Sequence, residues 1–165
     1  MTYLRDFGEF ALIDLIAREE KPHPQVILGL GDDTAVIEHG SQWLLCTTDM
    51  LMEGVHFTLQ TTSAFQLGQK ALAVNMSDIA AMGGTPTFAL VSLGLPGQMT
   101  VDFVQELYRG MQLIAGEVVS IVGGDTVQSP QGMVINVALL GQVPQGKGVL
   151  RSGAQVGDLI CMTNT

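Results

Sequence analysis

The sequence predicts a single α+β domain, and three observations support this prediction. The chain has 165 residues, enough for one domain with a hydrophobic core of its own. Segments with strand and helix patterns are mixed along it, without the regular βαβ repeat of a parallel sheet. Hydrophobic residues make up 47% of the composition, and we interpret the surplus apolar surface as a subunit or domain interface.

In the first half of the chain the pattern predicts two helices and three strands. Phe10, Ile13 and Ala17 recur at helical spacing, which indicates an amphipathic helix. Ser63 is a favourable N-cap for a second helix, and the glycines at 83–84 stop it. The expected elements are a helix over Phe7–Glu20 that ends at Lys21–Pro24, strands over Val26–Leu30, Ala35–Glu38 and Trp43–Thr48, and a helix from Ser63 to about Met82.

In the second half, Thr100 is a good N-cap, and Asp102 suits the first turn of the helix that follows. The chain stops just inside an apolar segment, so we expect a fragment, with one domain over 1–155 and the start of a second over 156–165. The expected elements are a strand over Phe88–Leu95, a helix from Thr100 to about Val118, a short buried strand over Ser120–Val122, a long strand over Met133–Val143, and a strand that begins at Leu159–Met162.

Composition and charge exclude several classes of protein. A net charge of -9 and a pI near 4.5 argue against a protein that tracks nucleic-acid phosphates. Two long stretches lack charged side chains, one between Ile79 and Met99 and one between Thr126 and Lys147. Prolines interrupt both, with glycines in the first and glutamine and asparagine in the second, so we expect no transmembrane helix. The N-terminus lacks the layout of a signal peptide, and we expect a cytoplasmic protein. Cys46 and Cys161 lie in apolar segments and are interpreted as reduced core residues.

Four short acidic motifs stand out, because only 14% of the residues are charged. Each places an aspartate beside glycine, a small hydroxyl residue or an amide, where a buried apolar run ends. Carboxylates from separate segments suit a hard cation such as Mg2+, and cations held in this way usually bridge phosphate oxygens. This pattern favours phosphoryl chemistry. The motifs are Gly31-Asp32-Asp33, Thr47-Thr48-Asp49, Asn75-Met76-Ser77-Asp78 and Gly123-Gly124-Asp125-Thr126.

The motifs also have structural interpretations. Gly31-Asp32-Asp33 taken alone is ordinary turn chemistry. Asp78 lies in an apolar helix, where a buried carboxylate needs either a hydrogen bond at the helix end or a cation, and both remain open. Asp125 follows two glycines that can form a turn or allow a ligand to approach the backbone.

His56 belongs to the string Glu53-Gly54-Val55-His56-Phe57 and lies seven residues after Asp49, with a glycine between them. This spacing places His56 near the same site as Asp49, where it could contact an anionic group of the substrate. The Walker A motif, the kinase motifs and the nucleophile elbow of hydrolases are absent from the sequence.

Together these strings resemble the N-terminal domain of the thiamine-monophosphate kinase family, over essentially the whole chain. This family belongs to a superfamily with aminoimidazole ribonucleotide synthetase, selenophosphate synthetase and a hydrogenase-maturation dehydratase. The resemblance is carried by Gly8-Glu9-Phe10, Gly31 to Ala35, Thr48-Asp49, Glu53 to Phe57, Lys70 to Gly83, Val122 to Thr126, Gly141 to Pro144, and Arg151 to Ala154 with Gly157-Asp158.

The resemblance implies ATP-dependent phosphorylation of thiamine monophosphate to thiamine diphosphate by direct transfer. It also implies a mixed sheet with helices on one face, which pairs with the sheet of a second copy into a barrel across a homodimer. Several Mg2+ ions would be held by Asp32, Asp49, Asp78 and Asp125 with Thr47 and Thr48; ATP would contact Tyr108, Gly124, Asp125 and Arg151; and His56 would touch the substrate.

Two other interpretations remain open. One is a different ATP-dependent enzyme of the same superfamily, although the reactive N-terminal cysteine that would favour selenophosphate synthesis is absent before Cys46. The other is a non-catalytic dimerisation module. A test of whether the isolated chain binds Mg-ATP would distinguish a nucleotide-binding site from a non-catalytic dimerisation module.

Overall fold

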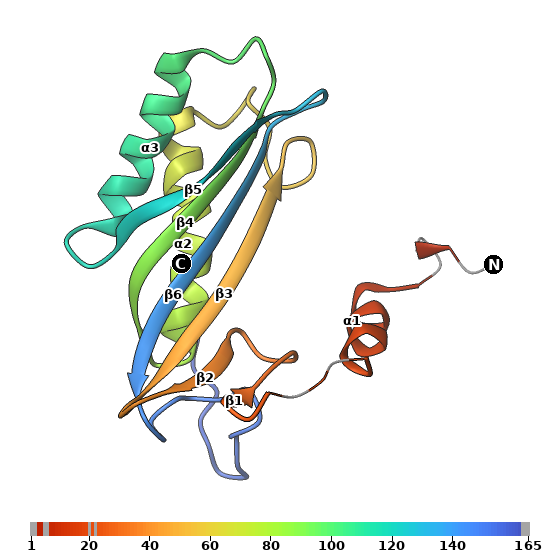
Figure 1. Ribbon diagram of the computed structural model, residues 1–165, viewed down its shortest axis with the longest axis vertical. Coiled ribbons are helices and arrows are strands. Elements are labelled where there is room, and N and C mark those ends of the chain that lie inside the picture. The colour runs from red at the N-terminus through yellow and green to blue at the C-terminus, as the bar shows by residue number, and fades with distance from the viewer. Residues whose placement is uncertain (1–2, 5–6, 20, 22, 163–165) are drawn as a thin grey trace.

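The computed structural model describes residues 3–4, 7–19, 21 and 23–162, and it shows one mixed sheet with two helices packed on one side (Figure 1). The sheet has six strands in the order β1-β2-β3-β6-β4-β5. Neighbouring strands are antiparallel except β4 and β5, which are parallel. The strands are β1 (Val26–Leu28), β2 (Ala35–His39), β3 (Gln42–Met52), β4 (Thr85–Leu95), β5 (Ser120–Gln128) and β6 (Val134–Pro144).

The two packed helices are α2 (Ala64–Ala81) and α3 (Val101–Ala115). Ser63 and Gln66 form a reciprocal capping box at the start of α2, and the Thr100 side chain accepts from the Phe103 N–H at the start of α3, so both predicted N-caps are confirmed. Helix α2 lies on β3, β6 and β4, and α3 packs on α2. A Cβ atom on Gly110 would lie 2.0 Å from the Phe65 carbonyl oxygen, so the close crossing of the helices requires glycine there.

Alternation along the strands divides the sheet into two faces. On β6, Ile135, Val137 and Leu139 are buried beneath the helices. The opposite face, here called the helix-free face, carries apolar side chains that remain partly exposed. Met50 is 54% exposed, Phe88 49% and Leu90 44%.

Strand β5 and helix α1 differ from the elements predicted from the sequence. Strand β5 was expected to be short and buried over Ser120–Val122, but it runs to Gln128 and is mostly exposed, because it forms an edge of the sheet. Helix α1 (Glu9–Ala17) is shorter than expected and has no buried residue, since it lies apart from the sheet (Figure 1). Glu20 and Pro22, at the expected end of that helix, lie outside the described residues.

At the other end of the chain, residues 159–162 are exposed and form no strand. Cys161 is therefore exposed rather than in the core, and Cys46 is half-buried; both are free thiols. Burial raises the pKa of the Cys46 thiol. No helix in the described part of the chain is long and apolar enough to span a membrane.

Candidate functional site

Asp78 lies near the end of α2, and its carboxylate faces strand β3. The Thr47 hydroxyl donates a hydrogen bond to Oδ2 of Asp78, with 2.7 Å between the oxygens. The hydrogen bond that the carboxylate accepts thus comes from a strand side chain rather than from the end of the helix, and the role of a cation stays a prediction. Position 49 lies two residues further along β3 and therefore on the same face of the sheet.

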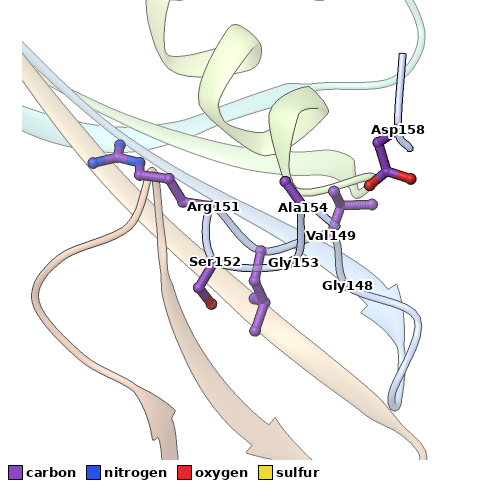
Figure 2. A pocket seen from close by; sticks show the side chains of 8 residues that line it. Gly148, Val149, Arg151, Ser152, Gly153, Ala154 and Asp158 are labelled. Atoms are coloured by element: carbon purple, nitrogen blue, oxygen red, sulfur yellow. The ribbon is translucent and has the colours of Figure 1, made fainter. Parts of the chain in front are cut away.

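The Gly31-Asp32-Asp33 motif is joined to the segment that follows β6. The Arg151 N–H donates to Oδ2 of Asp32 over 3.1 Å, and the Arg151 guanidinium forms an ion pair with Oδ1 of Asp33 over 2.5 Å. Figure 2 shows that Arg151 extends away from the turn formed by Ser152 and Gly153. Asp33 and Arg151 are 118 residues apart in the sequence, so this contact joins the first acidic motif to a distant part of the chain.

The pKa of Asp78 is raised above its ordinary value, mainly because burial penalises the charged form. The hydrogen bond from Thr47 acts in the opposite direction, whereas the negative charges of Asp49 and Asp33 raise the pKa further and Arg151 lowers it. These side chains are close enough to affect one another, so three of the predicted acidic motifs converge.

A cavity of about 430 Å³ opens beside this acidic group; we call it the His56 cavity. Nδ1 of His56 accepts a hydrogen bond from the Met52 N–H over 3.0 Å. The Lys70 ammonium donates to the His56 carbonyl oxygen over 2.6 Å. The cavity is lined by Asp49, Met50, Leu51, His56, Lys70, Val74, Ser77 and Asp78.

A second cavity, of about 340 Å³, lies between the Gly31 loop and β3. Asp32, Asp33, Thr47 and Thr48 line it together with Thr34. Thr34 is 2% exposed, and its hydroxyl has no hydrogen-bond partner among the described residues. The predicted hydroxyl ligands therefore lie beside the acidic motifs.

Asp125 is not part of this convergence. It pairs with Ser92, which in turn pairs with Asn136, and it lines a depression of about 340 Å³ that also contains Met50. This depression lies on the helix-free face, whereas Asp49 faces α2, so the two aspartates lie on opposite faces of the sheet. Oδ1 of Asp125 accepts from the Thr126 N–H over 2.8 Å.

Packing explains why position 124 is a glycine, and the sequence alone did not reveal this. Its φ is +151°, and a Cβ atom would lie 1.7 Å from the Val91 carbonyl oxygen. Glycine is therefore required for the approach of β5 to β4, whether or not a ligand binds there.

Tyr108 lies on α3, half-buried against the hydrophobic core, and burial raises the pKa of its phenol. It lines neither the His56 cavity nor the cavity at Thr34.

In the part of the chain that the structure describes, the acidic side chains do not form a ready-made metal site. Within the described ranges, no three His, Cys, Asp or Glu side chains lie together as a ligand set. The carboxylates of Asp49 and Asp78 nevertheless fit a cation, since the negative charge of Asp49 raises the pKa of Asp78 and a cation bound between them would relieve that repulsion. Such a cation would complete its ligand shell with water or phosphate oxygens, as Mg2+ commonly does.

Reasoning from the sequence alone assigned no role to Asp33, Thr34 or Lys70. One available signal was that Lys70 and Asp78 are the two charged residues of α2. The partner of Asp33 and the burial of Thr34 depend on long-range contacts that no local pattern reveals.

Comparison with known proteins adds to this geometry. Residues 31–143 match the family described as AIR synthase related protein, N-terminal domain. The thiamine-monophosphate kinase of Bacillus subtilis is 41% identical over 158 residues, which cover 94% of this chain and 48% of that protein. The enzyme of Escherichia coli is 39% identical over 168 residues, which cover 96% and 48%. The chain thus spans about half the length of these relatives.

Solved structures agree with this comparison. One described as AaThiL complexed with AMPPCP and TMP has a TM-score of 0.84 and 41% identity, over 96% of this chain and 48% of that one. Thiamine monophosphate kinase from Aquifex aeolicus has a TM-score of 0.70 and 34% identity, over 86% and 44%. The resemblance noted in the sequence and the α+β fold are both confirmed, and the chain belongs to the AIR synthase related protein family, whose N-terminal domain it carries.

Proposed function

We propose that this chain is the Mg2+- and nucleotide-binding half of a thiamine-monophosphate kinase, which transfers the γ-phosphoryl group of ATP to thiamine monophosphate. The observation that carries the proposal is the position of Asp78 and Asp49 at a cavity that also contains His56 and Lys70. Carboxylates and cationic or neutral donors in one cavity suit a metal-bound phosphate donor and an anionic acceptor. Relatives that carry this name support the assignment.

In the proposed reaction, a phosphate oxygen of thiamine monophosphate attacks the γ-phosphorus of ATP. A new P–O bond forms, the bond from the γ-phosphorus to the β–γ bridging oxygen breaks, and ADP leaves. The acceptor phosphate is largely ionised at neutral pH, so the protein needs mainly to orient and neutralise two polyanions. Bound Mg2+ would supply the neutralising charge.

The residues take the following proposed roles. Asp32, Asp49 and Asp78 would hold Mg2+ with Thr47 and Thr48, and His56 would contact the acceptor. Nucleotide contacts are assigned to Arg151, Tyr108, Gly124 and Asp125, with Asp125 also a metal ligand. The proposed domain limits are 1–155 for the nucleotide- and Mg2+-binding domain and 156–165 for the start of a second domain. Because ATP is the donor, the enzyme would act in the cytoplasm.

We also propose that the chain forms a homodimer through the helix-free face. The face exposes Met50, Phe88 and Leu90, an arrangement that a second sheet could cover to form a barrel. Asp125 lies on this face, so pairing of two sheets would enclose it.

The direct test follows thiamine diphosphate by chromatography after a longer protein containing this chain is incubated with ATP, Mg2+ and thiamine monophosphate. Product that depends on both ATP and Mg2+ is expected. Failure to form product with thiamine monophosphate would overturn the proposed function.

A further inference from the structure

Lys70 lies on the face of α2 that borders the His56 cavity. Val74 and Ser77 follow it by four and seven residues, the spacing of one helix face, and both also line the cavity. The side chain is thus held by a regular helix, whereas His56 lies in the turn that follows β3.

Among the residues that the structure describes, no carboxylate forms an ion pair with Lys70. Across the described residues, the ion pairs are Arg109 with Glu106 and Arg151 with Asp33. Lys70 instead donates to the neutral carbonyl oxygen of His56. An ammonium has three N–H donors, so two remain for another group.

A backbone hydrogen bond to the His56 ring determines which ring nitrogen can donate to a ligand. Because Nδ1 accepts from the Met52 N–H, the neutral ring carries its proton on Nε2. The turn itself is fixed by the backbone bonds from His56 N to Met52 O at 2.9 Å and from Gly54 N to Phe57 O at 2.8 Å. Helix α2 therefore positions the N–H donors of Lys70, and the hydrogen-bonded turn after β3 positions the N–H donor of His56.

We propose that Lys70 binds the phosphate of the acceptor substrate in the His56 cavity, alongside the Nε2–H of His56. Mg2+ held by Asp49 and Asp78 would offset the negative charge of those carboxylates, and the Lys70 ammonium adds a positive charge on the same cavity, which can hold a phosphate monoester and favour it over the corresponding free alcohol. The identity of the acceptor as thiamine monophosphate rests on the proposed function, whereas the phosphate site rests on this chain alone.

The test uses the 165-residue chain with Mg2+ and follows ligand binding by NMR, observing 31P for thiamine monophosphate and inorganic phosphate and 1H for thiamine. Lys70→Met removes the charge, Lys70→Gln keeps a neutral donor, and Lys70→Arg keeps a cation. Lys147→Met is the matched control, because Lys147 is an exposed lysine in the turn after β6.

We expect Lys70→Met and Lys70→Gln to raise the Kd for thiamine monophosphate about tenfold or more, the scale of a charge-assisted contact. Lys70→Arg should remain within about threefold of the unmodified chain, and so should the control. The weaker affinity for thiamine should not change. If Lys70 only secured the His56 turn, Lys70→Gln would restore affinity, and the proposal would be wrong.

A second measurement does not depend on how the variants fold. In the unmodified chain, thiamine monophosphate should slow the labelling of Lys70 by an amine-reactive reagent, read by mass spectrometry, and leave Lys147 unaffected. Equal labelling with and without ligand would overturn the assignment.

The outcomes also separate this inference from the proposed function. Binding of thiamine monophosphate that Lys70→Met leaves intact overturns the inference alone. Binding of inorganic phosphate that requires Lys70, without any binding of thiamine monophosphate, supports the phosphate site but counts against the proposed substrate. If neither ligand binds, the phosphate site is refuted, and the kinase assay then decides the proposed function.

Discussion

Thr47 and Asp78 join strand β3 to helix α2 through one hydrogen bond of 2.7 Å between Oγ1 and Oδ2. The hydroxyl stabilises the charged form of the carboxylate, but burial outweighs it and the pKa stays raised. The site therefore contains a carboxylate that is more costly to ionise in the folded chain than in the unfolded one.

Asp78→Asn should stabilise the metal-free chain at neutral pH. The amide oxygen can still accept from Thr47, and the repulsion from Asp49 and Asp33 disappears. Because the folded pKa of Asp78 is raised, the folded state binds more protons between the unfolded and folded values, so the stability contribution is lost as pH rises through that interval. Urea unfolding at several pH values with a chelator should show the gain of the variant growing from acid to neutral pH. A gain that shrinks as pH rises would contradict the prediction.

Asp49→Asn, in a longer protein that contains this chain, should reduce Mg2+-dependent turnover by about a hundredfold or more, the scale of losing one preorganised electrostatic contact. Folding should be little affected, since removing one of several repelling carboxylates costs the metal-free state nothing. The measurements are the melting temperature without metal and turnover with Mg2+. Large destabilisation with normal turnover would make Asp49 a structural residue.

The isolated chain should be a homodimer at micromolar concentration, with a dimer mass by light scattering. Phe88→Glu places a charge on the helix-free face and should shift the mass to that of a monomer. Val101→Glu is the control, because Val101 is 72% exposed at the start of α3, where an acidic residue is favourable. A monomer mass for the unmodified chain would refute the interface.

The 165-residue chain should not convert thiamine monophosphate at a useful rate, whereas a longer protein that spans the length of the relatives should. Phosphoryl transfer depends on the alignment of donor and acceptor, and this chain covers 48% of the Bacillus subtilis relative. The longer protein should also prefer thiamine monophosphate to free thiamine. Chromatography of thiamine diphosphate tests both points, and substantial product from the short chain would contradict the first.

The sequence predicted features whose causes are local. Ser63 and Thr100 cap their helices through neighbouring backbone groups, so the starts of α2 and α3 followed from a few residues. The sequence also predicted that acidic motifs would converge, and the charges of Asp33 and Asp49 both act on Asp78, whereas the role of these motifs in holding Mg2+ stays a prediction.

Features set by distant contacts were not predictable in the same way. The position of Asp125 on the helix-free face depends on how β5 aligns with β4. The ion pair of Arg151 with Asp33 closes a loop of more than a hundred residues. The apolar side of α1 matched the pattern of a core helix, but no local pattern shows whether such a side finds a partner.

The alternation of side chains along β3 makes its length as critical as its composition. Thr47 and Asp49 face α2, while Thr48 and Met50 face the other way. Deleting one residue between Trp43 and Thr47 would slide the strand by one position and exchange the two sets. The Asp49 carboxylate would then lie on the helix-free face and would no longer face Asp78 on α2. Insertions and deletions in related chains should therefore fall in the loops that flank β3 and leave the strand itself constant in length.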